Sequence, residues 1–153
     1  MLTKNELMAI PIMIRDIDRT KARIEKMRSK LYSPQGFDSR ERVQTSGTQR
    51  DELVDMVMDF EAKLETKKAE VEGLKRQAIA LFEPLEAEAK LLMTLRYIGA
   101  QSWPEIAEVM NYSPPSLFRR HRQIMSELFP EDEEPTVSDG RKEQDHGDNT
   151  TNT

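Results

Sequence analysis

The residues best suited to specific contacts lie close together near the end of the chain. Residues 113 to 126 contain three arginines and neither Asp nor Glu, although the chain as a whole has a net charge of −5. Arg carries a planar guanidinium that donates two parallel hydrogen bonds to a guanine edge or a phosphate, and Gln pairs with adenine. We therefore expect a DNA-contacting surface made of Ser113, Ser116, Arg119, Arg120, Arg122 and Gln123.

Different roles are expected within this surface. Base-edge contacts are predicted for Arg119, Arg120 and Gln123, and mainly phosphate contacts for Ser113, Ser116 and Arg122. A helix start attracts phosphate through its free amides. Pro114 and Pro115 remove two of these amides, so we expect a weaker phosphate clamp than usual.

Three short helices are predicted to position these residues, over about 86–98, 102–110 and 113–128. Ser102 and Glu105 have the spacing of a capping box, and Gly99 suits the preceding helix end. Asn111 tolerates the left-handed backbone that a tight turn needs, and Ser113 is expected to cap the last helix. This order predicts a helix-turn-helix within residues 85–129.

The buried side of this unit follows from the spacing of its apolar residues. Leu117, His121, Ile124 and Leu128 are separated by four, three and four residues, so they share one side of a helix. His121 is therefore expected to be packed and hydrogen-bonded rather than catalytic. The predicted helix-turn-helix core comprises Trp103, Ile106, Ala107, Leu117, His121 and Ile124.

Several short motifs resemble a known family. They are Arg96-Tyr97-Ile98, Ser102-Trp103, Glu105-Ile106-Ala107, Tyr112-Ser113, and Arg119 with His121. Together they resemble the C-terminal part of ArpU/RinA-like phage regulators, a module similar to region 4 of sigma-70-type factors. The likeness is strong over residues 96–128, whereas the N-terminal helix, the patch at 43–46 and the second long helix are compatible with it. Pro114 and Pro115 depart from the pattern, which places base contacts from those two positions in doubt.

The resemblance implies a sequence-specific transcriptional regulator of a bacteriophage or prophage, often acting on late genes. Its partners would be double-stranded DNA and, as a further partner, the RNA polymerase of a bacterial host. The recognition helix of the family corresponds to Ser113–Leu128 here.

Two long helices are predicted before this unit, over Lys4–Tyr32 and about Thr48–Phe82, around a loop at 33–47. Thr3 and Glu6 have the spacing of a capping box at the start of the first helix. Apolar residues recur at heptad spacing in both, which is typical of coiled-coil packing. The two helices could pair as an antiparallel hairpin or join two chains in a homodimer, because either arrangement buries the same stripes. Pro11 predicts a kink or a restart. Lys21 and Lys67 occupy seam positions, where a polar residue restricts register.

Composition limits the remaining possibilities. The chain contains no Cys, which fits a reducing cytoplasm, and no stretch long and apolar enough to span a bilayer. Residues 130–153 hold two basic and eight acidic residues and almost no apolar ones, so we expect a disordered acidic tail. The expected fold is all-α, with a hairpin or coiled-coil region (1–82), a helix-turn-helix (85–129) and a tail (130–153).

The sequence contains no pattern typical of an enzyme, a cofactor site or a metal site. The two histidines, His121 and His146, lie far apart, and no Gly-rich phosphate loop or Cys nucleophile occurs. Two other functions remain open beside a DNA-binding regulator. One is a DNA-packaging component like a small terminase subunit, and the other is an adaptor that binds polymerase or another protein without DNA.

Overall fold

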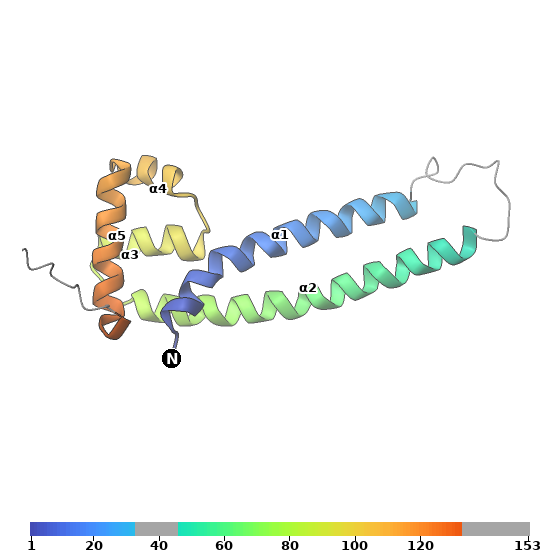
Figure 1. Ribbon diagram of the computed structural model, residues 1–153, viewed down its shortest axis with the longest axis horizontal. Helices are drawn as coiled ribbons and strands as arrows, with labels where there is room; N and C mark the ends of the chain where they lie inside the picture. The colour runs from blue at the N-terminus through green and yellow to red at the C-terminus, as the bar shows by residue number, and fades with distance from the viewer. Residues whose placement is uncertain (33–45, 133–153) are drawn as a thin grey trace, which may run out of the picture.

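Two long helices and three short ones form the fold. The structure is a computed structural model, and it describes residues 1–32 and 46–132. Helices α1 (Lys4–Tyr32) and α2 (Ser46–Phe82) are followed by α3 (Ala87–Met93), α4 (Trp103–Met110) and α5 (Pro114–Leu128). A π-helical turn, η1 (Thr94–Ile98), continues α3, and a 3-10 turn, η2 (Pro130–Asp132), follows α5. The expectation of an all-α fold with a long helical pair is confirmed, and the short helices gather at one end of that pair (Figure 1).

The two long helices pair with each other within one chain as an antiparallel hairpin. Their apolar stripes meet along the seam, where the buried residues are Ile17, Ile24, Met27, Val57, Leu64 and Val71. The hairpin is one of the two arrangements that the heptad spacing left open. Helix α1 runs through Pro11 without the restart that was one of the two expectations for this residue.

The two lysines predicted at the seam behave differently. Lys67 Nζ lies 2.5 Å from Asp16 Oδ2 on the facing helix, so it spans the seam as part of an ion pair. Lys21 is exposed, so its side chain is not enclosed by the seam. The flexible four-carbon stem of a lysine allows its ammonium to reach water from the edge of a seam.

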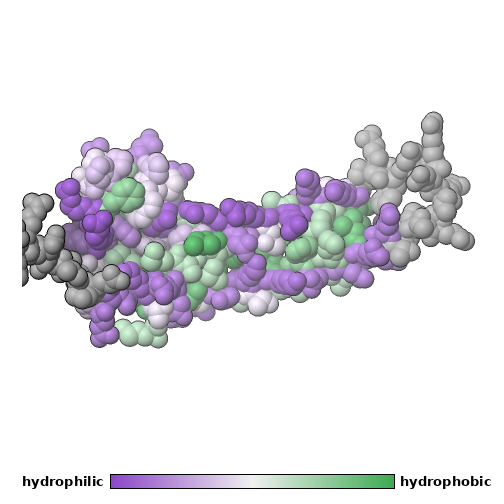
Figure 2. Space-filling view, in the orientation of Figure 1, coloured by the Kyte–Doolittle hydropathy of each residue, from purple (hydrophilic) through white to green (hydrophobic). Residues whose placement is uncertain are grey.

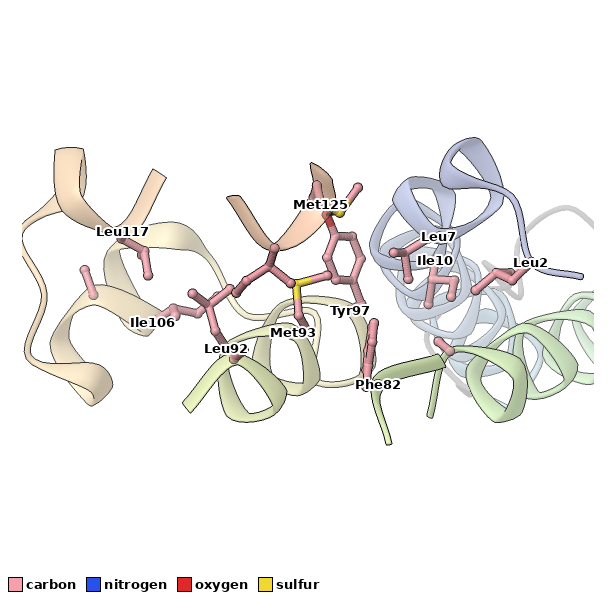
Figure 3. Close-up of a cluster of buried hydrophobic side chains, with 14 residues drawn as sticks. Leu2, Leu7, Ile10, Phe82, Leu92, Met93, Tyr97, Ile106, Leu117 and Met125 are labelled. Carbon is pink, nitrogen blue, oxygen red and sulfur yellow. Dashed lines mark hydrogen bonds between the residues drawn. The ribbon is translucent and has the colours of Figure 1, made fainter. Parts of the chain in front are cut away.

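A second core joins the hairpin to the short helices. It contains Leu7 and Ile10 of α1, Ala78 and Phe82 of α2, and buried residues from α3, η1, α4 and α5. Phe82 and Tyr97 lie at the junction, with their ring centroids 6.3 Å apart (Figure 3). The core thus continues across the boundary predicted between residues 82 and 85, and it fixes the short helices on the base of the hairpin.

Helix ends follow local signals in most places. The predicted capping box at the start of α1 is confirmed, because Glu6 Oε2 accepts the Thr3 amide at 2.8 Å and Thr3 Oγ1 accepts the Glu6 amide at 3.2 Å. Helix α2 begins at Ser46, two residues before its predicted start. The helix expected over 86–98 changes at Thr94 from α to π geometry.

Some expectations concern residues outside the described part of the chain. They include most of the loop predicted at 33–47, most of the 43–46 patch, and the tail from residue 133 with His146. Within residues 1–32 and 46–132, no helix combines the length and the apolar character needed to cross a membrane.

Candidate nucleic-acid interface

The connection from η1 to α4 is a tight backbone turn. Gly99 has a φ of −80°, whereas the next residue, Ala100, has a φ of 51°. A Cβ on residue 99 would lie 2.9 Å from the Leu95 carbonyl oxygen. Gly99 does end the helix as predicted, but close approach to Leu95 explains its presence, and Ala100 takes the left-handed conformation in its place.

Helix α4 starts and ends as its sequence predicts. Ser102 and Glu105 form the reciprocal capping box, with the Ser102 amide 2.8 Å from Glu105 Oε2. These hydrogen bonds lower the pKa of Glu105, because they stabilise its charged form. Asn111 adopts the left-handed conformation at φ 56° and ψ 43°, and the Tyr112 amide donates to the Ala107 carbonyl at 2.9 Å. The turn between α4 and α5 is thereby fixed.

One side of α5 is firmly anchored. Leu117 and Ile124 are 0% exposed and pack in the same core as Ile106 and Ala107 of α4 (Figure 3). The predicted four-residue buried stripe is confirmed only in part. Leu117 and Ile124 are buried, but His121 and Leu128 are half-buried, and Met125 is buried instead. Met125 was missed because its position lies one step beyond the 4-3-4 spacing.

The start of α5 differs from the prediction that the Ser113 side chain caps the helix. Ser113 occupies the N-cap position with an extended backbone, but its side chain accepts no amide hydrogen. Instead, its hydroxyl donates to Ser116 Oγ at 2.8 Å. Pro114 and Pro115 follow Ser113, so the amide of the second helical position, a usual partner of a cap, does not exist. Both serines therefore lie at the helix start, hydrogen-bonded to each other.

The opposite side of α5 carries exposed polar side chains. Arg119, Arg122 and Gln123 are all exposed. A helical residue advances by about 100° around the axis, which places these three away from Leu117 and Ile124. Phe118 lies at the edge of this side, 45% exposed, with its ring centroid 5.3 Å from that of Trp103. An aromatic residue among exposed arginines was not predicted, because Phe118 belongs neither to the 4-3-4 apolar stripe of this helix nor to its polar residues.

Arg120 has a different environment from its neighbours. Its guanidinium forms ion pairs with Glu86 and, at 3.5 Å, with Glu88, both at the start of α3, and its side chain is only 20% exposed. It also donates to Gln123 Oε1 at 3.1 Å. The Tyr112 hydroxyl donates to Glu88, and this bond raises the pKa of Tyr112. Tyr112 of the turn and Arg120 of α5 therefore both bind the same short stretch at the start of α3.

Aromatic side chains surround His121 at the border of the core. Tyr97 Oη and His121 Nε2 are 2.8 Å apart, and the rings of Trp103 and His121 meet edge to face at 4.7 Å. Burial lowers the pKa of His121 to about 4, and the charges of Arg96 and Lys4 act in the same direction. Burial also raises the pKa of Tyr97 to about 12. Both groups are therefore neutral at pH 7, as expected for packed side chains.

Trp103 is held on both sides, which explains its place in the predicted core. The Arg96 guanidinium lies 4.5 Å from the Trp103 ring centre and donates to the Gln101 carbonyl at 3.0 Å. Burial lowers the pKa of Arg96. Arg96 is adjacent to the buried Tyr97, and the cation–π contact with Trp103 accounts for a charged residue at this position.

The predicted surface residues thus separate into two groups. Ser113, Ser116, Arg119, Arg122 and Gln123 lie along the outer side and start of α5, while Arg120 points to α3. In the described residues, no three His, Asp or Glu side chains are grouped so as to hold a metal ion. The arrangement presents cationic and amide donors on a firmly mounted helix, a chemistry suited to phosphates and base edges.

Comparisons with family models, curated proteins and solved structures identified no significant match to this chain.

Proposed function

We propose that the chain binds double-stranded DNA, with α4, its turn and α5 acting as a helix-turn-helix and α5 entering the major groove. One observation carries the proposal: α5 buries Leu117 and Ile124 completely while Arg119 and Arg122 project from its other side. A recognition helix requires this combination, because its scaffold must stay fixed while its donors remain free to reach the groove.

Roles are assigned according to exposure. Arg119 and Gln123 would read base edges, and Arg122, Ser113 and Ser116 would contact phosphates. Arg120 is given a positioning role rather than the base contact expected from sequence, because Glu86 and Glu88 already bind its guanidinium. Phe118 adds an exposed apolar group beside the arginines.

The biological role proposed is regulation of transcription in a bacteriophage or prophage, with control of late genes by a protein that acts near host RNA polymerase. The motifs between residues 96 and 128, which resemble ArpU/RinA-like regulators, support this part of the proposal. The chain's own helical residues would perform the binding, without a cofactor.

Selection of bound duplexes from a random library, followed by sequencing, tests the proposal. We expect the wild-type chain to enrich one motif, and Arg119→Ala to relax preference at one base pair with a loss of about 1–3 kcal/mol. Arg76→Ala is the control, because it removes an exposed arginine of α2. An enriched motif that Arg119→Ala leaves unchanged would contradict the assignment, and no enrichment at low salt would contradict DNA binding itself.

A further inference from the structure

A row of basic residues follows one side of α1. Arg15, Arg19, Arg23, Lys26 and Lys30 are separated by four, four, three and four residues, and all five are exposed. With 3.6 residues per turn, this spacing keeps them on one side of the helix. That side points away from the seam residues Ile17 and Ile24, although the Arg23 guanidinium lies 5.3 Å from the ring centre of Phe60 on α2. We call these five residues the α1 basic row.

The cations of the two long helices differ in their partners. On α2, four lysines form ion pairs: Lys63 with Asp59, Lys67 with Asp16, Lys68 with Glu65 and Lys75 with Glu72. Among the described residues, no carboxylate forms an ion pair with any member of the α1 basic row. Helix α1 has eight basic and four acidic residues, and among its cations Arg28, which is outside the row, forms an ion pair with Glu61 of α2.

The row begins beside the short helices. Arg15 lies close enough to Arg96 that its charge adds to the effect of burial in lowering the pKa of Arg96. The first turns of α1 share a core with α3, α4 and α5, so the row has a fixed position relative to α5. Figure 2 shows hydrophilic side chains along the upper edge of α1 and around α5 on one face of the molecule.

From these observations we propose that the α1 basic row is a second anion-binding surface, which holds the phosphate backbone of the duplex beyond the bases that α5 contacts. The inference rests on the proposed DNA binding. From Arg15 to Lys30 the row extends about 22 Å at 1.5 Å per residue. This is roughly two thirds of a DNA helical turn, so several phosphates of one strand come within its reach. Such contacts add affinity and carry no sequence information.

The test compares two duplexes containing the selected motif, one limited to the motif and one extended by about one helical turn on each side. Arg19→Gln with Lys26→Gln and Lys30→Gln removes three charges from the row. Lys63→Gln with Lys68→Gln and Lys75→Gln removes three charges from α2 and serves as the matched control. Circular dichroism and thermal melting establish that both variants retain the helical fold.

For the wild-type chain we expect tighter binding to the extended duplex and a steeper fall of log affinity with log salt. The row variant should lose this difference, with a salt slope smaller by about 2–3, as expected for about three phosphate contacts. The α2 control should retain it. The inference is overturned if the wild-type chain does not distinguish the two duplexes, or if both variants weaken binding equally.

The same experiment separates this inference from the proposed function. If binding of the short duplex remains sensitive to Arg119→Ala but the row variant has no effect on binding, α5 stays the proposed interface. The role of the α1 basic row in binding DNA is then rejected. If the wild-type chain binds neither duplex at low salt, both the proposed DNA binding and the role of the α1 basic row are rejected. If the row variant instead loses only binding to an acidic peptide such as poly-glutamate, the surface recognises protein and the DNA assignment is wrong.

Discussion

The two ends of the α1–α2 hairpin consist of the same two helices but are held in different ways. At the end that meets the short helices, Leu7, Ile10 and Ala78 are 0% exposed. Toward the other end, Leu64 and Met27 are 7% and 9% exposed, and the described apolar residues around them come only from α1 and α2. We refer to the first as the proximal core and to the second as the distal core.

The difference shows what a third layer adds to a helical pair. Two helices cover only the facing side of each other, so water reaches the edges of every side chain in their seam. Helices α3, α4 and α5 close the proximal core from other directions, which allows complete burial there. Since burial of apolar surface is the main source of stability, resistance to unfolding should be concentrated where α5 is mounted.

Matched leucine substitutions should give the largest effect. Leu92→Ala removes a fully buried side chain from the proximal core, and Leu64→Ala removes one that is 7% exposed from the distal core. A Leu→Ala substitution in a core lowers the free energy of unfolding by about 2–5 kcal/mol. We expect the loss for Leu92→Ala near the upper limit of this range and the loss for Leu64→Ala near the lower one. Urea unfolding followed by circular dichroism measures both. Equal losses would show that the two cores are equivalent.

The proximal core should also respond to pH. His121 has its pKa lowered to about 4 by burial, while a histidine in the unfolded chain titrates near 6.5. Between these values the unfolded state binds more protons, so the free energy of unfolding should fall as the pH is lowered from about 6.5 to about 4. His121→Gln should show a shallower fall over this window in urea titrations at several pH values. Parallel curves for the two proteins would exclude His121 as the cause.

The ion pair across the hairpin seam should give the smallest effect. Lys67 and Asp16 have side chains that are 44% and 50% exposed, so solvent screens their attraction. Lys67→Met should therefore change the free energy of unfolding by less than about 1 kcal/mol, the range for surface pairs. Lys63→Met, which removes a pair outside the seam, is the control. A loss of several kcal/mol for Lys67→Met alone would mean that the seam depends on charge far more than its exposure indicates.

The predictable features of the fold depend on neighbours in sequence. The range of α1, the capping boxes of Thr3 and Ser102, and the left-handed Asn111 were predicted and are found. Each depends on residue types within a few positions. The pairing of the hairpin was open, because heptad spacing describes one face of a helix and does not identify the helix that covers it.

Part of the candidate site was beyond sequence reasoning for the same reason. Arg119 and Arg120 are adjacent and chemically identical, yet among the described residues only Arg120 forms ion pairs with carboxylates, and one of them, Glu86, lies 34 residues earlier in the chain. Phe118 stays 45% exposed although its ring centroid lies 5.3 Å from that of Trp103 in α4. Contacts between distant segments determine these differences, and no local pattern reports them.

The proximal core also has a consequence for biosynthesis. Leu7 and Ile10 leave the ribosome before Leu117 and Ile124, which belong to the same core and are made more than a hundred residues later. Helices α1 and α2 can pair in the meantime, but the base of that pair stays apolar and uncovered until α5 arrives. A nascent chain stalled before residue 114 should therefore be a better target for chaperones and proteases than the completed one.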